Sequence, residues 1–196
     1  WPASFSAAAR ERGLTSAGTV LVTSMASTAE TAMLTGVKVV EEGYPLRGEI
    51  RLAPSPNQPD AAAGRSPAPG ELWLDERLFA DLGVQVGDSV GLGEVTFRVG
   101  AMVSFESDRG ANFFSLLPRA IFNQLDLAAT GLIAEGSRAT WRLHVAGTPQ
   151  AVEAYEQWAR ANLERGQRVE TVENARPEVR AALDQAQRFL RLAALL

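Results

Sequence analysis

The sequence predicts an α+β protein in which a ferredoxin-like part carries an inserted small β-rich part and ends in a long helix. Three observations support this fold class. The pattern of a helix that ends in Glu-Arg-Gly before a strand occurs twice, at residues 10–13 and 163–166. A proline-rich stretch interrupts the chain at 53–70, and short apolar runs separated by glycines follow it. Two strand–helix–strand units that share one sheet make a ferredoxin-like domain.

Composition excludes several classes of function. The 196 residues include 19 basic and 23 acidic side chains, so the net charge is −4. An acidic domain lacks the basic surface that nucleic acid requires, and we therefore expect no nucleic acid partner. The chain has no cysteine and a single histidine, His144, which excludes thiolate chemistry, disulfides and multi-histidine metal sites. No P-loop or G-x-G-x-x-G motif is present, so we expect no nucleotide cofactor. The lack of cysteine, the single histidine and the lack of an oxygen-ligand loop also predict no bound metal.

The first 52 residues predict a helix followed by three strands. Pro2 suits the first turn of a helix over 2–12. Apolar runs predict strands over 18–24 and 33–40, and side-chain alternation predicts a third over 47–52. This first unit lacks an opening strand, so we expect the sequence to start just inside a longer unit.

The middle of the chain predicts a linker and an inserted subdomain. Residues 53–70 contain five of the ten prolines and show no periodicity, which is typical of a flexible linker. Residues 71–136 predict a small β-rich subdomain of short strands. Its helices are expected over 76–82, where Asp75 provides the N-cap, and over 119–125.

The chain then returns to the first part. Residues 137–176 predict a strand over 140–146, a helix over 149–165 and a strand over 167–172. The apolar stripe of this helix consists of Val152, Tyr155, Ala159 and Leu163.

The last 20 residues, 177–196, predict one continuous helix that begins at Pro177. Its surface becomes apolar on every side after Arg191, as expected where a helix leaves water. The final apolar run is far shorter than the roughly 18 residues a membrane span needs, so we expect a domain taken from a longer protein. The apolar stripe before this run comprises Val179, Ala182, Leu183, Ala186, Phe189, Leu190 and Ala193.

A small serine esterase is the alternative function. Residues 87–91 match the G-x-S-x-G nucleophile pattern, and Ser89, Asp108 or Asp126, and His144 follow the triad order of α/β-hydrolases. A nucleophile elbow is followed by a long helix, whereas here another strand pattern follows Ser89. We therefore interpret the motif as a glycine-rich hairpin and His144 as a strand residue.

Residues 106–114 are harder to explain by structure alone. They combine charged residues, a glycine, an asparagine and two adjacent phenylalanines. Adjacent residues of a regular element cannot both face the core. The sequence therefore predicts either an anchored loop or a contact with another subdomain or a partner. The residues assigned to such a contact are Asp108, Arg109, Gly110, Asn112, Phe113 and Phe114.

Several stretches, read together, resemble one family. They are residues 43–48 (Gly-Tyr-Pro-Leu-Arg-Gly), 73–75 with 86–90, 108–115 (Asp-Arg-Gly-Ala-Asn-Phe-Phe-Ser) and 130–133 with 136–138. The chain resembles the first periplasmic domain of FtsX/MacB-like ABC transporter permeases, in the YbbP-type branch. The run at 108–115 is the most specific piece, and the resemblance is looser over the first 42 residues.

The resemblance implies a mechanotransmission-type exporter rather than a pore. A separate cytoplasmic ABC subunit would hydrolyse ATP, and transmembrane helices would carry the motion to the periplasmic domain of this inner-membrane protein. This chain would have no catalytic residues. The implied partners are that ATPase, a periplasmic lysophospholipase or esterase, and a hydrophobic or lipid-like substrate.

The resemblance also implies a domain plan, the MacB-like periplasmic core. Residues 1–52 and 137–176 would form a discontinuous porter-like subdomain, with the linker at 53–70 and the insertion at 71–136. Residues 177–196 would form a stalk helix that leads into a transmembrane segment. The residues expected to couple the stalk to the membrane are Phe189, Leu190 and Arg191.

Overall fold

The computed structural model describes residues 1–109, 116–134 and 136–171. The chain divides into two compact units, Trp1–Ala151 and Val152–Leu196. The first unit contains the strands described below. The expected stalk helix at 177–196 lies outside the described residues.

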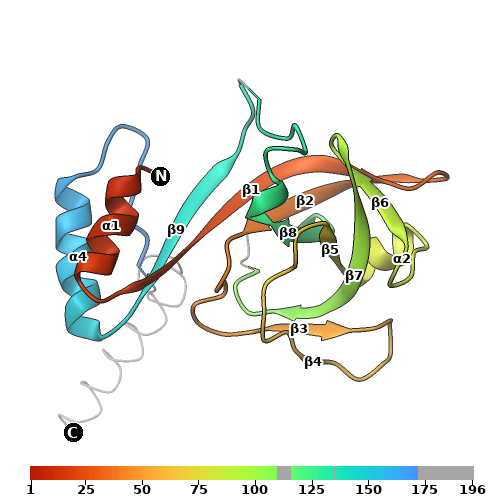
Figure 1. Ribbon diagram of the computed structural model, residues 1–196, viewed down its shortest axis with the longest axis horizontal. Helices are drawn as coiled ribbons and strands as arrows, with labels where there is room; N and C mark the ends of the chain where they lie inside the picture. Colours follow the sequence, from red (N-terminus) through yellow and green to blue (C-terminus); the bar gives the residue numbers. More distant parts are fainter. Residues whose placement is uncertain (110–115, 135, 172–196) are drawn as a thin grey trace, which may run out of the picture. The chain divides into compact units, whose positions relative to one another are not determined.

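The strands of the first unit form one nine-stranded mixed sheet, and six of them close into a ring (Figure 1). Their order is β7-β5-β8-β2-β1-β6, and β6 also pairs with β7. The pairs β2–β8 and β5–β7 are parallel, and the other pairs of the ring are antiparallel. The ring strands are β1 (Thr15–Ser27), β2 (Ala32–Val40), β5 (Glu71–Asp75), β6 (Ser89–Leu92), β7 (Val95–Glu106) and β8 (Arg119–Asn123).

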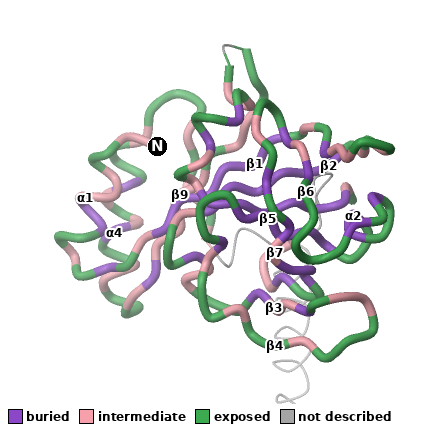
Figure 2. Tube along the Cα trace, turned by 45° about the vertical axis from the view of Figure 1, so that its right-hand side comes forward, coloured by how far each residue is buried: buried purple, intermediate pink, exposed green. Residues whose placement is uncertain are grey.

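Alternation along these strands separates two hydrophobic clusters. Leu72 and Leu74 belong to the larger cluster, to which every strand of the ring contributes, whereas Trp73 between them belongs to the smaller one. Successive side chains of a strand point to opposite faces, so the larger cluster fills the ring and the smaller one lies outside it. Figure 2 shows the buried positions concentrated along β1, β2 and β5.

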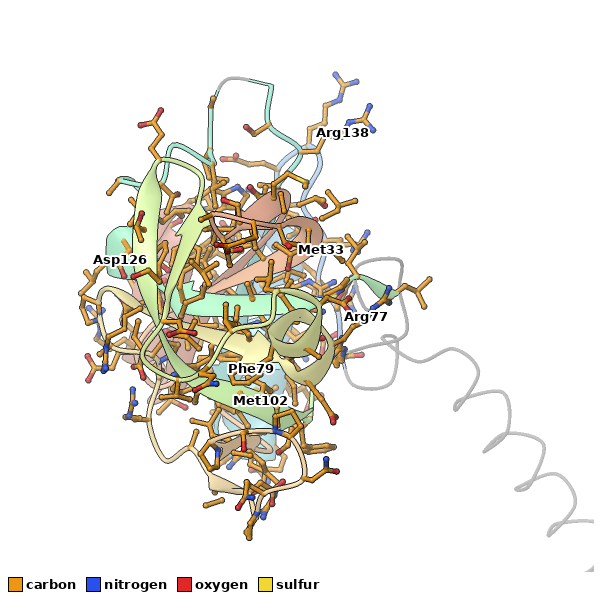
Figure 3. All side chains as sticks on the ribbon, turned by 90° about the vertical axis from the view of Figure 1, so that its right-hand side faces the viewer. Met33, Arg77, Phe79, Met102, Asp126 and Arg138 are labelled. Atoms are coloured by element: carbon orange, nitrogen blue, oxygen red, sulfur yellow. The ribbon has the colours of Figure 1, made fainter. Side chains whose placement is uncertain are left out.

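The helix α2 (Glu76–Asp81) adds side chains to the interior cluster. Phe79 of α2 and Met102 of β7 both belong to it (Figure 3). Asp75 caps this helix as expected, because its Oδ1 accepts a hydrogen bond of 2.9 Å from the backbone N–H of Leu78.

Three strands lie outside the ring. The strands β3 (Ile50–Ala53) and β4 (Ala61–Ala62) extend the sheet from the C-terminal half of β7. The strand β9 (Thr140–Ala146) pairs with the N-terminal part of β1, from Thr15 to Leu21, while β6 pairs with its C-terminal end at Ala26 and Ser27 (Figure 1). The long strand β1 therefore belongs both to the ring and to a two-stranded extension.

The expected helix over 119–125 is wrong. Residues Arg119–Asn123 form β8, which lies between β2 and β5, and Gln124–Asp126 form a short 3-10 helix, η1. All five residues of β8 are buried, so the strand lacks the alternation that distinguishes a strand from a buried helix. Pro118 opens no helix, and its carbonyl oxygen accepts hydrogen bonds from the backbone of Gly36 and from Thr35 Oγ1.

The helices near the two ends of the described residues agree with the expected ones. The first, α1 (Ala3–Glu11), follows Pro2. The second, α4 (Pro149–Ala161), ends earlier than expected, and it buries Tyr155 and Ala159 of the expected stripe. The strand expected over 167–172 is absent from residues 167–171, the part of it that the structure describes. The expected strand–helix–strand motif that begins with β9 and α4 therefore has no third element within these residues.

The segment 53–70 has specific contacts in the structure. Arg65 forms an ion pair with Glu71 at 2.6 Å, and the side-chain amide of Asn123 donates to Pro67 O at 2.8 Å. The ring contains β1 and β2 from before this segment and β5 to β8 from after it, and β9 pairs with β1. The sheet therefore continues across the expected domain boundaries at residues 52, 71 and 136. The division into a porter-like part and an inserted part stays a prediction.

No helix within the described part of the chain is long and apolar enough to cross a membrane.

Candidate functional site: a charge cluster around Lys38

Lys38 is the only lysine of the sequence, and it is buried. It lies on β2, where Val39 faces the ring interior and Lys38 faces outward with Val40. Its side chain is 4% exposed. A buried ammonium is tolerated when hydrogen-bonding and charged partners replace the lost water.

Three oxygen atoms replace that water. Lys38 Nζ donates to the hydroxyl of Tyr44 at 2.5 Å, to Glu106 Oε1 at 2.5 Å and to Asp108 Oδ1. An ammonium has three donors, so each one has an acceptor here. Because all three donors are engaged, the geometry holds Lys38 in place and offers no free amine for chemistry.

Further charges surround this centre. Arg119 Nε lies 4.0 Å from Glu106 Oε2, and Arg109 Nη2 forms an ion pair of 2.6 Å with Asp75 Oδ2. The cations Lys38, Arg109 and Arg119 therefore balance the anions Asp75, Glu106 and Asp108. We call these six residues with Tyr44 the Lys38 cluster. Asp75 also caps α2, so the cluster is tied to that helix.

The cluster perturbs the acidity of two of its members. Burial alone would raise the pKa of Asp108, but the charge of Lys38 and the hydrogen bond from it hold that pKa at about 2. Burial raises the pKa of the Tyr44 hydroxyl, and the negative charge of Asp108 raises it further. At neutral pH Asp108 is therefore ionised and Tyr44 is neutral.

The cluster brings together three stretches that are far apart in the sequence. Tyr44 belongs to 43–48, Asp75 to 73–75, and Asp108 and Arg109 to 108–115. Close packing of Gly48 on Ser107 supports the arrangement. A Cβ on Gly48 would lie 2.2 Å from Ser107 Oγ, and the φ of +76° at Gly48 also favours glycine. Backbone bonds join the same loops, since Ser107 N donates to Glu49 O at 3.1 Å.

Of the residues predicted to contact a partner, the structure places Asp108 and Arg109 in this cluster. The others, Gly110, Asn112, Phe113 and Phe114, lie outside the described residues, as do Phe189, Leu190 and Arg191 of the expected stalk. Lys38, Tyr44, Glu106 and Arg119 were not among the site residues predicted from the sequence. One feature of the sequence could have pointed to this site. Lys38 is the single lysine in a chain with 18 arginines, and it lies inside an apolar strand.

The structure contradicts the alternative that Ser89 and His144 form a catalytic pair. His144 lies opposite Ala17 of β1, whereas β6, which carries Ser89, meets β1 at Ala26. Nine residues of extended strand separate these positions, which corresponds to roughly 30 Å. His144 Nε2 instead lies 2.9 Å from Thr19 Oγ1. Ser89 is the first residue of β6, which forms a hairpin with β7, as expected for a glycine-rich hairpin.

A shallow hollow of about 540 Å³ lies beside α1 and β9. Trp1 and Trp141 contact each other edge to face in its wall, with ring centroids 6.1 Å apart. Trp1 packs directly on Gly18, where a Cβ would lie 1.9 Å from the indole.

Within the described residues, no three His, Asp or Glu side chains are grouped so that they would hold a metal ion.

Comparison with known proteins decides the family. No family model matches the sequence. Over 188 residues, or 96% of this chain, the sequence is 32% identical to the uncharacterised ABC transporter permease YbbP of Escherichia coli strain K12. The chain is an extracytoplasmic domain of a YbbP-like ABC transporter permease. It spans 22% of the length of that relative.

A solved structure agrees with this assignment at the level of the fold. The extracellular domain of the noncanonical ABC-type transporter YknZ, from Gram-positive bacteria, superimposes with a TM-score of 0.57 at 10% identity. The match covers 81% of the YbbP-like domain and 80% of the YknZ chain. The mixed α+β fold of the described residues therefore resembles that of another transporter domain.

Proposed function

We propose that this domain couples ATP hydrolysis in a cytoplasmic ABC subunit to the extraction or export of hydrophobic, lipid-like molecules. The observation that carries the proposal is the 32% identity to YbbP over 96% of the chain. In this mechanotransmission scheme the domain transports nothing by itself. It receives motion from membrane helices and passes that motion to its extracytoplasmic surface.

The proposal includes a place and partners. The domain lies in the periplasm as part of an inner-membrane permease, and the permease pairs with an ABC ATPase. A periplasmic lysophospholipase or esterase receives the extracted molecule. The stretch 108–115 is the proposed contact with such a partner, because the Lys38 cluster fixes its first two residues through Lys38 and Asp75.

The proposal also includes the domain plan. Residues 1–52 and 137–176 act as the porter-like part, 71–136 as the insertion, and 177–196 as the stalk helix. Support comes from the sequence pattern of the stalk and from β9, which pairs antiparallel with β1 at the meeting point of the two expected ferredoxin-like halves.

An insertion in the stalk of the full-length permease tests the proposal. A Gly-Ser pair placed after Gln185 interrupts the expected helix and its mechanical continuity. With the ATPase present in proteoliposomes, we expect ATP hydrolysis to continue while release of a fluorescent single-chain lipid from the membrane stops. The melting temperature of the 196-residue domain should change by a few degrees at most.

The matched control is the same insertion after Gln58, an exposed residue of the segment 53–70. We expect it to leave lipid release intact. Normal lipid release in the Gln185 variant would contradict the mechanism.

A further inference from the structure

We propose that Tyr44 links strand β9 to residues 106–109, so that a displacement of β9 reaches the start of the 108–115 stretch. Tyr44 is then a positioning residue for residues 106–109. This inference rests on the proposed function, because it assigns the route by which motion crosses the domain. Its two ends are β9, which leads directly toward α4, and the end of β7.

The first step of the route joins β9 to Tyr44. The ring of Tyr44 lies against the ring of His144 on β9, with centroids 5.5 Å apart and an angle of 55° between the planes. His144 is fixed in turn by its contact of 2.9 Å with Thr19 on β1. Tyr44 is 4% exposed, so a shift of His144 meets a packed ring rather than solvent.

The second step joins Tyr44 to the end of β7. Its hydroxyl accepts a hydrogen bond of 2.5 Å from Lys38 Nζ, and the same ammonium donates to Glu106 and Asp108. These two carboxylates flank Ser107, so a movement of the ammonium acts on both sides of that residue. Arg109, the next residue, is held by Asp75 at 2.6 Å.

The loop that carries Tyr44 is itself held from a third side. The single hydroxyl proton of Ser66 is shared between Tyr44 O, 3.3 Å from Ser66 Oγ, and Glu41 O, 3.2 Å from it. The ring and hydroxyl of Tyr44 therefore act from a fixed backbone. The route uses the sole histidine and the sole lysine of the chain, and it passes through one of its two tyrosines.

The test compares hydrogen–deuterium exchange in the full-length permease with its ATPase, nucleotide-free and trapped with ADP and vanadate. Two segments report on the two ends, residues 140–146 of β9 and residues 101–109, which comprise the end of β7 and the three residues after it. In the wild type we expect both segments to differ between the two states. A coupling claim needs such a response at both ends, because proximity alone does not establish it.

The informative variant is Tyr44→Phe, which keeps the ring against His144 and removes the oxygen that accepts from Lys38. We expect residues 140–146 to keep their nucleotide-dependent difference and residues 101–109 to lose theirs. Tyr155→Phe is the matched control, because it makes the same chemical change at the other tyrosine and should alter neither segment. His144→Gln is a second variant, which keeps a partner for Thr19 and removes the ring, and we expect the same loss at 101–109.

Other results would contradict either the route or the proposed function. An unchanged difference at 101–109 in either Tyr44→Phe or His144→Gln would overturn the route. Loss at both segments in Tyr44→Phe would also overturn it, because a relay acts downstream of β9. A wild type in which β9 responds and 101–109 does not would refute the inference but leave the proposed function standing. A wild type in which neither segment responds would refute the proposed function itself.

Discussion

Lys38 and Glu106 are 68 residues apart in the sequence, yet Lys38 Nζ lies 2.5 Å from Glu106 Oε1. Their strands, β2 and β7, are not neighbours, because β8 and β5 lie between them in the sheet. The pair meets on the outer face of the ring, with side chains 4% and 2% exposed. A buried ion pair of this kind adds little stability over an apolar pair, but its disruption leaves a buried charge without a partner.

Lys38→Met should therefore destabilise the domain strongly. The variant leaves Glu106 and Asp108 without the ammonium, and removal of one partner of a buried pair costs about 3–5 kcal/mol. Urea unfolding followed by circular dichroism measures the change. The double variant Lys38→Met with Glu106→Gln should recover part of the loss, because one uncompensated charge is removed. A loss of less than about 1 kcal/mol for the single variant would show that the cluster is not a stabilising anchor.

Acid should weaken the fold through Asp108. Its pKa is about 2 in the folded protein, below the ordinary value of 3.8, so the folded state binds the proton less tightly than the unfolded state. The stability that this group contributes is fully present above about pH 4 and is lost as the pH falls toward 2. Unfolding free energies measured between pH 2 and pH 6 should show the decline. Asp108→Asn should flatten the curve within that window, and an equally steep curve in this variant would assign the decline to other carboxylates.

The segment 53–70 should loosen when Arg65 is removed. Burial of Glu71 tends to raise its pKa, but the hydrogen bonds from Arg65 and from the backbone of Ala68 hold it at about 2. Arg65 is half exposed, so we expect Arg65→Ala to cost about 1 kcal/mol of stability. Limited proteolysis should cut the segment faster in the variant than in the wild type. Arg77→Ala, which removes an exposed ion pair on α2, is the control and should leave the cleavage rate in 53–70 unchanged.

Gly18→Ala should displace Trp1 from β1. A Cβ there would lie 1.9 Å from the indole, and overpacking of this kind typically costs about 1–3 kcal/mol. The emission maximum of tryptophan fluorescence should move to longer wavelength as Trp1 gains contact with water. Gly166→Ala introduces backbone strain at a φ of +87° but has no atom within 4 Å of the added Cβ, so it displaces no tryptophan and should leave the emission unchanged. Identical spectra for Gly18→Ala and the wild type would contradict the packing of Trp1 on this strand.

A fluorophosphonate probe should not label Ser89. The strand register places His144 roughly 30 Å away along β1, so His144 does not activate the hydroxyl. Mass spectrometry of the treated domain should find no adduct at this residue. Stoichiometric labelling that Ser89→Ala abolishes would restore the esterase hypothesis.

The sequence by itself determined the elements that depend on nearby residues. Pro2 precedes α1, Asp75 caps α2, and the alternation over 140–146 predicts β9, because caps and periodicity are encoded within a few positions of each other. The family was also within reach of the sequence, since short motifs keep their order along the chain. Those motifs did not show why they occur together.

The tertiary structure alone decided the features that depend on distant partners. Arg119–Asn123 became a strand because β2 and β5 pair with its two edges while the two hydrophobic clusters cover its two faces, and no local pattern records those distant partners. The same reason applies to Lys38. A lysine in an apolar strand is satisfied only where Tyr44, Glu106 and Asp108 converge from other segments, and that convergence exists only after the ring has closed.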